Sequence, residues 1–251
     1  MRKSQVNKSL LSILFGTGIA LAAAVCAYFL HIPLYYFAAA FGLSILYFTR
    51  RIVDPFLLIL FTALLAICTS EIAYFTPILF SLLMLLIPIY VLMRTGKSLT
   101  DVLRELGFHG SPMRAFLFAV FSMIPVFLLM LLLSYAASML GFNDAQKVDE
   151  KISLLPFYVL VYAVTLGPIA EEIFFRSFLT RYMNPIFANL LFAFAHFSYG
   201  SVYEILGAFG LGIFLYLIYR LSGDLKTAVF AHMFINLGSL IVMYTALRGL
   251  L

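Results

Sequence analysis

The run MRAFLFAVFSMIPVFLLMLLLSYAASML at residues 113–140 carries a single charged side chain, Arg114. A helix of about 20 apolar residues crosses the hydrocarbon core of a bilayer, so this run predicts a transmembrane helix. The whole chain has the same character: of its 251 residues 64% are hydrophobic and 11% charged, and the mean hydropathy is +1.08. A soluble domain carries about 25% charged residues. We therefore expect an all-α fold, a polytopic transmembrane helix bundle.

Further apolar runs predict about nine spans, with eight as the alternative count because several runs are short. Their approximate ranges are 10–30, 33–49, 54–69, 72–94, 113–140, 152–180, 185–199, 204–220 and 225–247. The polar connection after the fourth run places Leu99, Val102, Leu103 and Leu106 on one helical face. That pattern predicts a short interfacial helix. The first run follows Arg2 and Lys3 like a signal peptide, but its length favours an uncleaved span.

The basic residues predict a cytoplasmic N-terminus. If successive spans alternate direction from that start, most of the 16 Lys and Arg residues fall on or near the inner side. Lys147, Lys151 and Arg248 fall outside. This distribution follows the positive-inside rule. The net charge of +5 comes from these membrane-flanking positions and not from a separate basic cluster, so we expect no nucleic-acid partner. Cys26 and Cys68 lie in apolar runs and are interpreted as buried thiols.

Five polar residues interrupt the apolar segments of the second half of the chain: Glu171, Glu172, His196, His232 and Asn236. An ionisable side chain at membrane depth costs about 3 kcal/mol or more. Counted along their predicted helices, Glu171, His196 and His232 lie roughly 10–17 Å below the inner surface, at 1.5 Å per residue. We therefore expect one shared polar site formed by three helices.

Helical spacing separates the roles of the two glutamates in GPIAEEIFFRSF, residues 167–178. Glu172 and Arg176 are spaced i, i+4, which predicts a buried ion pair with a structural role. Glu171 points about 100° away and lacks that partner, so we interpret it as a proton acceptor. Gly167 and Pro168 are expected to loosen or kink the helix just before it, because a proline ring removes a backbone hydrogen bond.

The other two motifs place aromatic and hydrogen-bonding groups one turn apart. Phe192 and His196 are spaced i, i+4, so the two rings are expected to pack together. His232 and Asn236 share a face and can both donate hydrogen bonds, as a pair that stabilises an oxyanion would. His31 and His109 lie at a span end and in the polar loop, and we interpret both as solvated surface residues.

In this order the motifs E-E-x-x-x-R, F-x-x-x-H and H-x-x-x-N resemble those of the CPBP family of intramembrane proteases. That family includes eukaryotic CAAX prenyl endopeptidases and bacterial Abi and bacteriocin-immunity proteins. The resemblance covers roughly residues 150–247; Ser177 is a small departure, since a glycine often follows the motif arginine. It implies two parts: N-terminal spans of uncertain role in residues 1–112, with the interfacial helix, and a catalytic helix bundle in residues 113–251.

The resemblance implies an endopeptidase that hydrolyses a membrane-associated or lipid-modified substrate. Glu171 and His196 would activate a water, and His232 and Asn236 would stabilise the oxyanion, with Glu172, Arg176 and Phe192 in support. The resemblance favours a cofactor-free, glutamate-type reaction, and the chain has no H-E-x-x-H motif. Zinc bound by Glu171, His196 and His232 is the alternative.

We expect a multi-pass protein of a prokaryotic plasma membrane, in contact with lipid. Two other functional classes stay open. A proton-coupled transporter also uses buried Glu and His residues and broken helices. A non-catalytic immunity or scaffold protein would keep the motifs and act by binding.

Overall fold

The structure is a computed structural model that describes residues 76–247. The predicted spans 10–30, 33–49 and 54–69 lie outside the described residues, so the total of eight or nine spans and the cytoplasmic N-terminus stay predictions. The chain divides into two compact units. One comprises residues 84–180 and 185–251 and is described below. The other, residues 1–83 and 181–184, is described only over 76–83 and 181–184.

The described part of the chain is helical and contains no β-strand, as predicted. Its elements are α4 (Thr76–Met93), α5 (Leu99–Glu105), α6 (Pro112–Met139), α7 (Gln146–Ser153), α8 (Phe157–Val164), α9 (Leu166–Glu171), the π-helical segment η1 (Glu172–Phe178), the 3₁₀ turn η2 (Leu179–Arg181), α10 (Pro185–Ala195), the 3₁₀ turn η3 (His196–Tyr199), α11 (Val202–Ser222) and α12 (Leu225–Leu247).

Three of the described helices are long and apolar enough to cross a membrane: α6, α11 and α12. They correspond to the predicted spans 113–140, 204–220 and 225–247. A fourth span is possible if the bent pair of Phe157–Val164 and Leu166–Arg181 is taken together. The predicted span 185–199 is shorter than expected, because α10 ends at Ala195 and η3 leads into a left-handed Gly200 with φ 69°.

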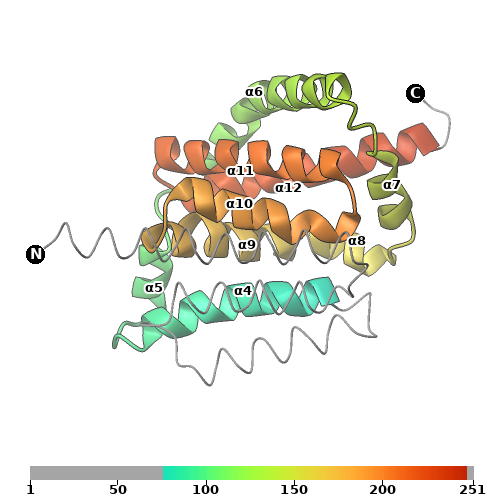
Figure 1. Cartoon of the computed structure of the whole chain (residues 1–251). Coiled ribbons are helices and arrows are strands. Elements are labelled where there is room, and N and C mark those ends of the chain that lie inside the picture. The colour runs from blue at the N-terminus through green and yellow to red at the C-terminus, as the bar shows by residue number, and fades with distance from the viewer. Residues whose placement is uncertain (1–75, 248–251) are drawn as a thin grey trace, which may run out of the picture. The chain divides into compact units, whose positions relative to one another are not determined.

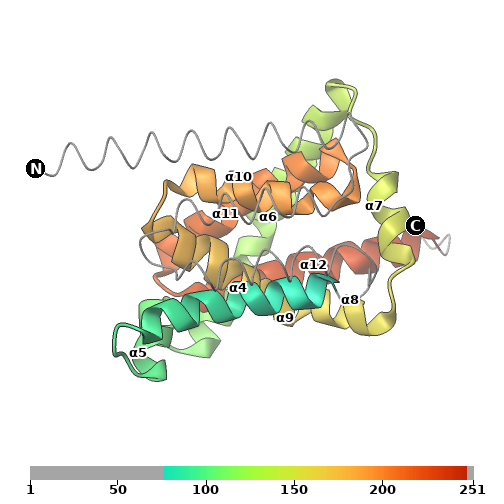
Figure 2. The same cartoon turned by 60° about the horizontal axis from the view of Figure 1, so that its bottom comes forward.

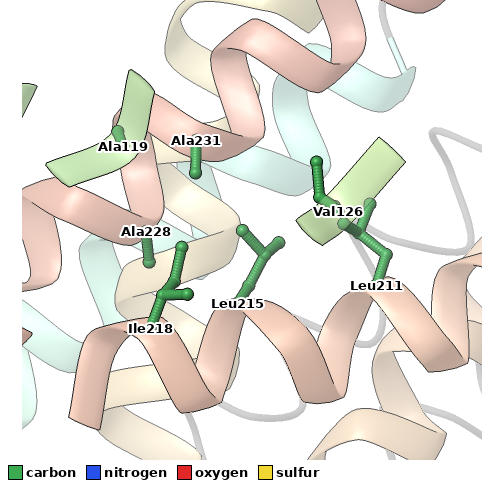
Figure 3. Packing of buried hydrophobic residues seen from close by; sticks show 7 residues of the cluster. All are labelled: Ala119, Val126, Leu211, Leu215, Ile218, Ala228 and Ala231. Carbon is green, nitrogen blue, oxygen red and sulfur yellow. The ribbon is translucent and has the colours of Figure 1, made fainter. Parts of the chain in front are cut away.

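The three long helices meet along one apolar core, and α10 packs on α11 beside them. Figure 3 shows that α6 contributes Ala119 and Val126, facing Leu215 of α11 and Ala231 of α12. The small alanines let the helix backbones approach, as is common in membranes, where lipid tails are as apolar as the side chains and association depends on close packing. This core packs α12, which carries His232 and Asn236, against α6 and α11.

A short helix, α5, is present where the interfacial helix was predicted, and its apolar residues are only partly covered by protein, since Leu99 is exposed. Val102 and Leu106 are fully buried, in a cluster that includes Ile173 and Leu225.

Figures 1 and 2 show α5 and α7 at opposite ends of the described bundle. We refer to these as the α5 end and the α7 end.

The predicted span 152–180 is not one helix. Its helix begins at Phe157, after Pro156, whose backbone is extended with φ −60° and ψ 147°. It breaks at Thr165, where φ is −114° and ψ −80°, and the two halves are bent by 42°. Pro168 explains the break, since it has no N–H for the carbonyl four residues before it and its ring crowds that carbonyl. The kink expected from Gly167 and Pro168 is therefore present.

Candidate active site

The segment that follows the break carries Glu172 and Arg176 in a wide, π-helical turn. All seven residues of η1 are buried, including Phe174, Phe175 and Phe178. The side-chain hydroxyl of Thr180 donates to the carbonyl of Arg176 at 2.6 Å and so satisfies an acceptor near the end of the widened turn. Single π-helical turns occur often at functional sites, because they turn side chains away from regular helical positions.

Glu172 and Arg176 form the expected buried ion pair. Arg176 Nε lies 3.2 Å from Glu172 Oε2, and both side chains are almost completely buried. The N–H does not point along that line well enough to make a hydrogen bond, so charge attraction holds the pair. The guanidinium carbon lies 3.9 Å from the centre of the Phe192 ring, in a cation–π contact. Phe192 thus supports the pair as well as the histidine that follows it.

His232 of α12 lies between the two glutamates. Its Nδ1 is 2.8 Å from Glu172 Oε1, and its Nε2 is 3.8 Å from Glu171 Oε2. Because Glu172 is paired with a guanidinium, we assign the proton to Nδ1, which then donates to the carboxylate. Nε2 consequently faces Glu171. Glu172 therefore does more than stabilise its own helix through the ion pair with Arg176, since it also fixes the orientation of the His232 ring.

Glu171 is the more accessible of the two carboxylates. Its side chain is 23% exposed, whereas that of Glu172 is 0% exposed. The i, i+4 ion pair of its neighbour is absent for Glu171, as expected, but His232 lies within ion-pair distance. Sequence spacing could not reveal this partner, because the two residues lie on different helices.

His196 joins the site through Phe192. The centroid of the Phe192 ring lies 4.7 Å from that of His196 and 6.0 Å from that of His232, so this aromatic ring lies close to both imidazoles. The expected contact between Phe192 and His196 is present. His196 Nδ1 is 2.8 Å from the carbonyl oxygen of Phe192, and we assign it as the donor. Its Nε2 is then left as the acceptor nitrogen.

Asn236 plays a role at the helix break that its sequence position did not indicate. Its amide nitrogen donates to the carbonyl of Ala163 at 2.8 Å. In a continuous helix that carbonyl would accept from the N–H of Gly167. His232 and Asn236 were expected to direct their hydrogen-bond donors at an oxyanion. In the structure each already uses one donor within the protein: His232 bonds Glu172, and Asn236 bonds the carbonyl of Ala163.

A polar clamp holds the chain just after His196. Asp144, in the connection before α7, accepts hydrogen bonds from the hydroxyl of Ser201 at 3.0 Å and the backbone amides of Val202 and Tyr203 at 3.0 and 3.1 Å. Burial alone would raise the pKa of Asp144, but the amides of Tyr203 and Val202 outweigh it and hold the pKa below 3.8. The clamp ties the α7 end to the start of α11 and so fixes η3.

The residues named for zinc do not gather into a ligand set. Within residues 76–247, no three His, Cys, Asp or Glu side chains are arranged to hold a metal ion. His232 uses Nδ1 on Glu172, and His196 uses Nδ1 on a backbone carbonyl.

Two residues beside this site were not predicted from the sequence. Asn189 is a buried amide in the apolar helix α10, and Gly212 lies opposite it on α11. The test that found the other residues, a polar side chain inside an apolar run, would have found Asn189. Nothing in the sequence marks Gly212.

Comparison with known proteins covers the same region. Residues 153–238 match the Rce1-like family model, whose description is type II CAAX prenyl endopeptidase Rce1-like. The match contains all seven residues of the three motifs and confirms the expected resemblance to CPBP and CAAX proteases. No curated protein and no solved structure matched.

Proposed function

We propose that this chain, a membrane protein whose residues 153–238 are similar to type II CAAX prenyl endopeptidases, is an intramembrane endopeptidase of the glutamate type. The observation that carries the proposal is the continuous polar contact from Glu171 through His232 and Glu172 to Arg176. Its steps are 3.8, 2.8 and 3.2 Å. Burying several ionisable groups in an apolar bundle costs free energy. A role in acid–base catalysis would explain why the protein contains them.

Glu171 is the proposed general base. It takes a proton from a water, and the oxygen of that water attacks the scissile carbonyl carbon. His196 assists through Nε2, which can accept a hydrogen bond from the same water. The support is that Glu171 is the partly exposed carboxylate, whereas Glu172 is committed to Arg176 and His232. A positioned base of this kind contributes about 10²–10⁴-fold to a rate.

Charge balance gives His232 its proposed role. Two carboxylates and one guanidinium leave one net negative charge, which a proton held between Glu171 and His232 would neutralise. With Nδ1 donating to Glu172, that proton places an N–H on Nε2, which can stabilise the oxyanion of the tetrahedral intermediate. Glu171 then passes the proton that it took from the water to the leaving amine as the C–N bond breaks, while His232 keeps its Nε2–H on the oxyanion until the carbonyl forms again. Asn236 contributes its second amide hydrogen while the first stays on Ala163.

The substrate is proposed from the same resemblance. A peptide whose cleavage site lies at membrane depth, in a membrane-associated or lipid-modified protein, fits a site buried in apolar helices. Because a backbone in lipid must keep its hydrogen bonds, the scissile bond has to lie in an unwound segment. The prokaryotic plasma membrane stays the proposed location, and the division into residues 1–112 and 113–251 stays a prediction.

Cleavage of a fluorogenic lipidated peptide by the purified protein in detergent tests the proposal. We expect Glu171→Gln to lower turnover by about a hundredfold or more, in line with loss of a general base. The thermal midpoint should stay near wild type, because the amide keeps the shape of the carboxylate. Glu150→Gln, an exposed change on α7, is the matched control and should leave turnover unchanged. Wild-type turnover should persist in a metal chelator.

The competing functions predict different results. A non-catalytic immunity or scaffold protein shows no cleavage and keeps its phenotype when Glu171 is replaced. A proton-coupled transporter moves a solute in proteoliposomes without cleaving a peptide. Turnover of Glu171→Gln within a few-fold of wild type would remove Glu171 from the base role.

A further inference from the structure

The outer nitrogens of Arg176 are not accounted for by the ion pair. Nε faces Glu172, but Nη1 and Nη2 are buried and have no hydrogen-bond partner within the described residues. A buried, charged N–H group without an acceptor costs free energy, so the surroundings of the guanidinium must compensate for it or confine it. Phe192 covers one of its faces.

Gly212 of α11 leaves open the space on the Nη2 side. A Cβ built at this glycine would lie 3.2 Å from Arg176 Nη2, 3.2 Å from Phe192 Cδ1 and 2.6 Å from Asn189 Oδ1. A contact of 2.6 Å cannot exist without a shift of the neighbours. Gly212 lies within a regular helix and needs no unusual backbone angle, while glycine weakens a helix. The advantage of glycine at position 212 is therefore that it leaves room for the side chains of Arg176, Phe192 and Asn189.

Asn189 of α10 brings a polar group into the same space. Its side chain belongs to a residue that is 3% exposed, and it lies three positions before Phe192, on the same helical face. A Cβ at Gly212 would meet both Asn189 Oδ1 and Arg176 Nη2, so the amide oxygen lies near the guanidinium, although these two atoms form no hydrogen bond in the structure. An amide oxygen is a neutral acceptor that suits a guanidinium N–H, so it adds no further charge beside Arg176.

We propose that Asn189 and Gly212 are positioning residues that together seat the guanidinium of Arg176. The seat determines where Nε lies, Nε determines the position of Glu172, and Glu172 orients His232 through Nδ1. Neither residue touches substrate. The inference deepens the proposed function and rests on it for its effect on turnover, whereas its effect on packing is independent of any activity.

Alanine substitutions on α11 test the seat directly. Gly212→Ala should lower kcat about tenfold or more with KM changed less than about twofold, since a small misplacement in a catalytic group is costly. Its pH profile of kcat should also shift, because the His232 ring loses its fixed orientation. Gly207→Ala is the matched control: it adds the same methyl group to the same helix, where the nearest atom is Met130 Cε at 3.7 Å. Equal behaviour of the two variants would overturn the proposal.

Variants of Asn189 show whether this residue positions the Arg176 guanidinium through its acceptor oxygen or only fills volume in the core. Asn189→Ser keeps an acceptor oxygen and should retain most turnover, whereas Asn189→Leu fills a similar volume without one and should lose about tenfold. Thermal midpoints then give a readout without activity. Gly212→Ala should lower the midpoint less in an Asn189→Ala background than in wild type, because the 2.6 Å contact is gone.

The outcomes are distinguishable. If the wild type cleaves no peptide but the two substitutions are coupled in stability, the proposed function fails and the seat stands. If their effects on the midpoint are additive, the two side chains do not share the space and the seat fails. If Gly212→Ala does not fold, the comparison of Asn189→Ser with Asn189→Leu decides, and equal turnover of those variants would overturn the proposal.

Discussion

Replacing Arg176 by alanine should destabilise the protein strongly, and the structure gives the size of the effect. Glu172 has no exposed surface, so loss of its cation leaves a carboxylate in an apolar bundle, with His232 as its close partner among the described residues. Breaking a buried pair in this way costs about 3–5 kcal/mol. The stacking on Phe192 is lost as well. For a chain of this size the thermal midpoint should fall by roughly 6–20 °C.

Circular dichroism in detergent is a suitable assay, because the described chain is helical and the sequence contains no tryptophan. Arg220→Ala, which removes an exposed arginine from α11, is the matched control and should leave the midpoint unchanged. The double variant Glu172→Gln with Arg176→Met contains no buried ion and should regain most of the lost stability. Its glutamine can still accept from His232 Nδ1.

Three results would contradict parts of this reasoning. If Arg176→Ala melts like wild type, the pair does not stabilise the fold. If it melts like wild type and loses turnover, Arg176 acts in the reaction and the structural interpretation of the pair is wrong. If the double variant is no more stable than Arg176→Ala, the cost lies in lost packing and not in an uncompensated charge.

Two further predictions concern the supports of the site. Asn236→Ala frees the Ala163 carbonyl at the helix break and should cost about 1–3 kcal/mol, seen as a lower thermal midpoint; an unchanged midpoint would show that the bond does not hold the break. Asp144→Asn tests the clamp after His196: since the fold holds the pKa of Asp144 below 3.8, the charged form stabilises the protein above that pH, and the benefit is lost as pH falls through the folded pKa. Wild type should therefore exceed the variant in chemical-denaturation stability at pH 5–7 and approach it below pH 3.8; a constant difference across that range would contradict the role of the charge.

The sequence was sufficient for features that depend on local spacing and composition. Apolar runs predicted α6, α11 and α12, because the length of a spanning helix follows from bilayer thickness. The i, i+4 spacing predicted the contacts of Glu172 with Arg176 and of Phe192 with His196, since both members of each pair lie on one element. The three motifs also identified the family that residues 153–238 resemble.

Helix ends were less predictable than the kink. The bend within 152–180 followed from Gly167 and Pro168, whereas the helix start at Phe157 and the end of α10 in a 3₁₀ turn before Gly200 did not follow from the apolar runs. Hydropathy averages over a window and is insensitive to a single residue that cannot continue a backbone hydrogen-bond ladder.

Contacts between helices were decided by the tertiary structure alone. That His232 lies between the two glutamates, that Asn236 bonds the Ala163 carbonyl and that Gly212 leaves room for Arg176 all depend on how α9, η1, α10, α11 and α12 pack. Sequence spacing fixes the face of one helix on which a residue lies. It does not fix the rotation and offset of neighbouring helices, which the interlocking of small and large side chains determines, and it is that interlocking that brings these polar groups together.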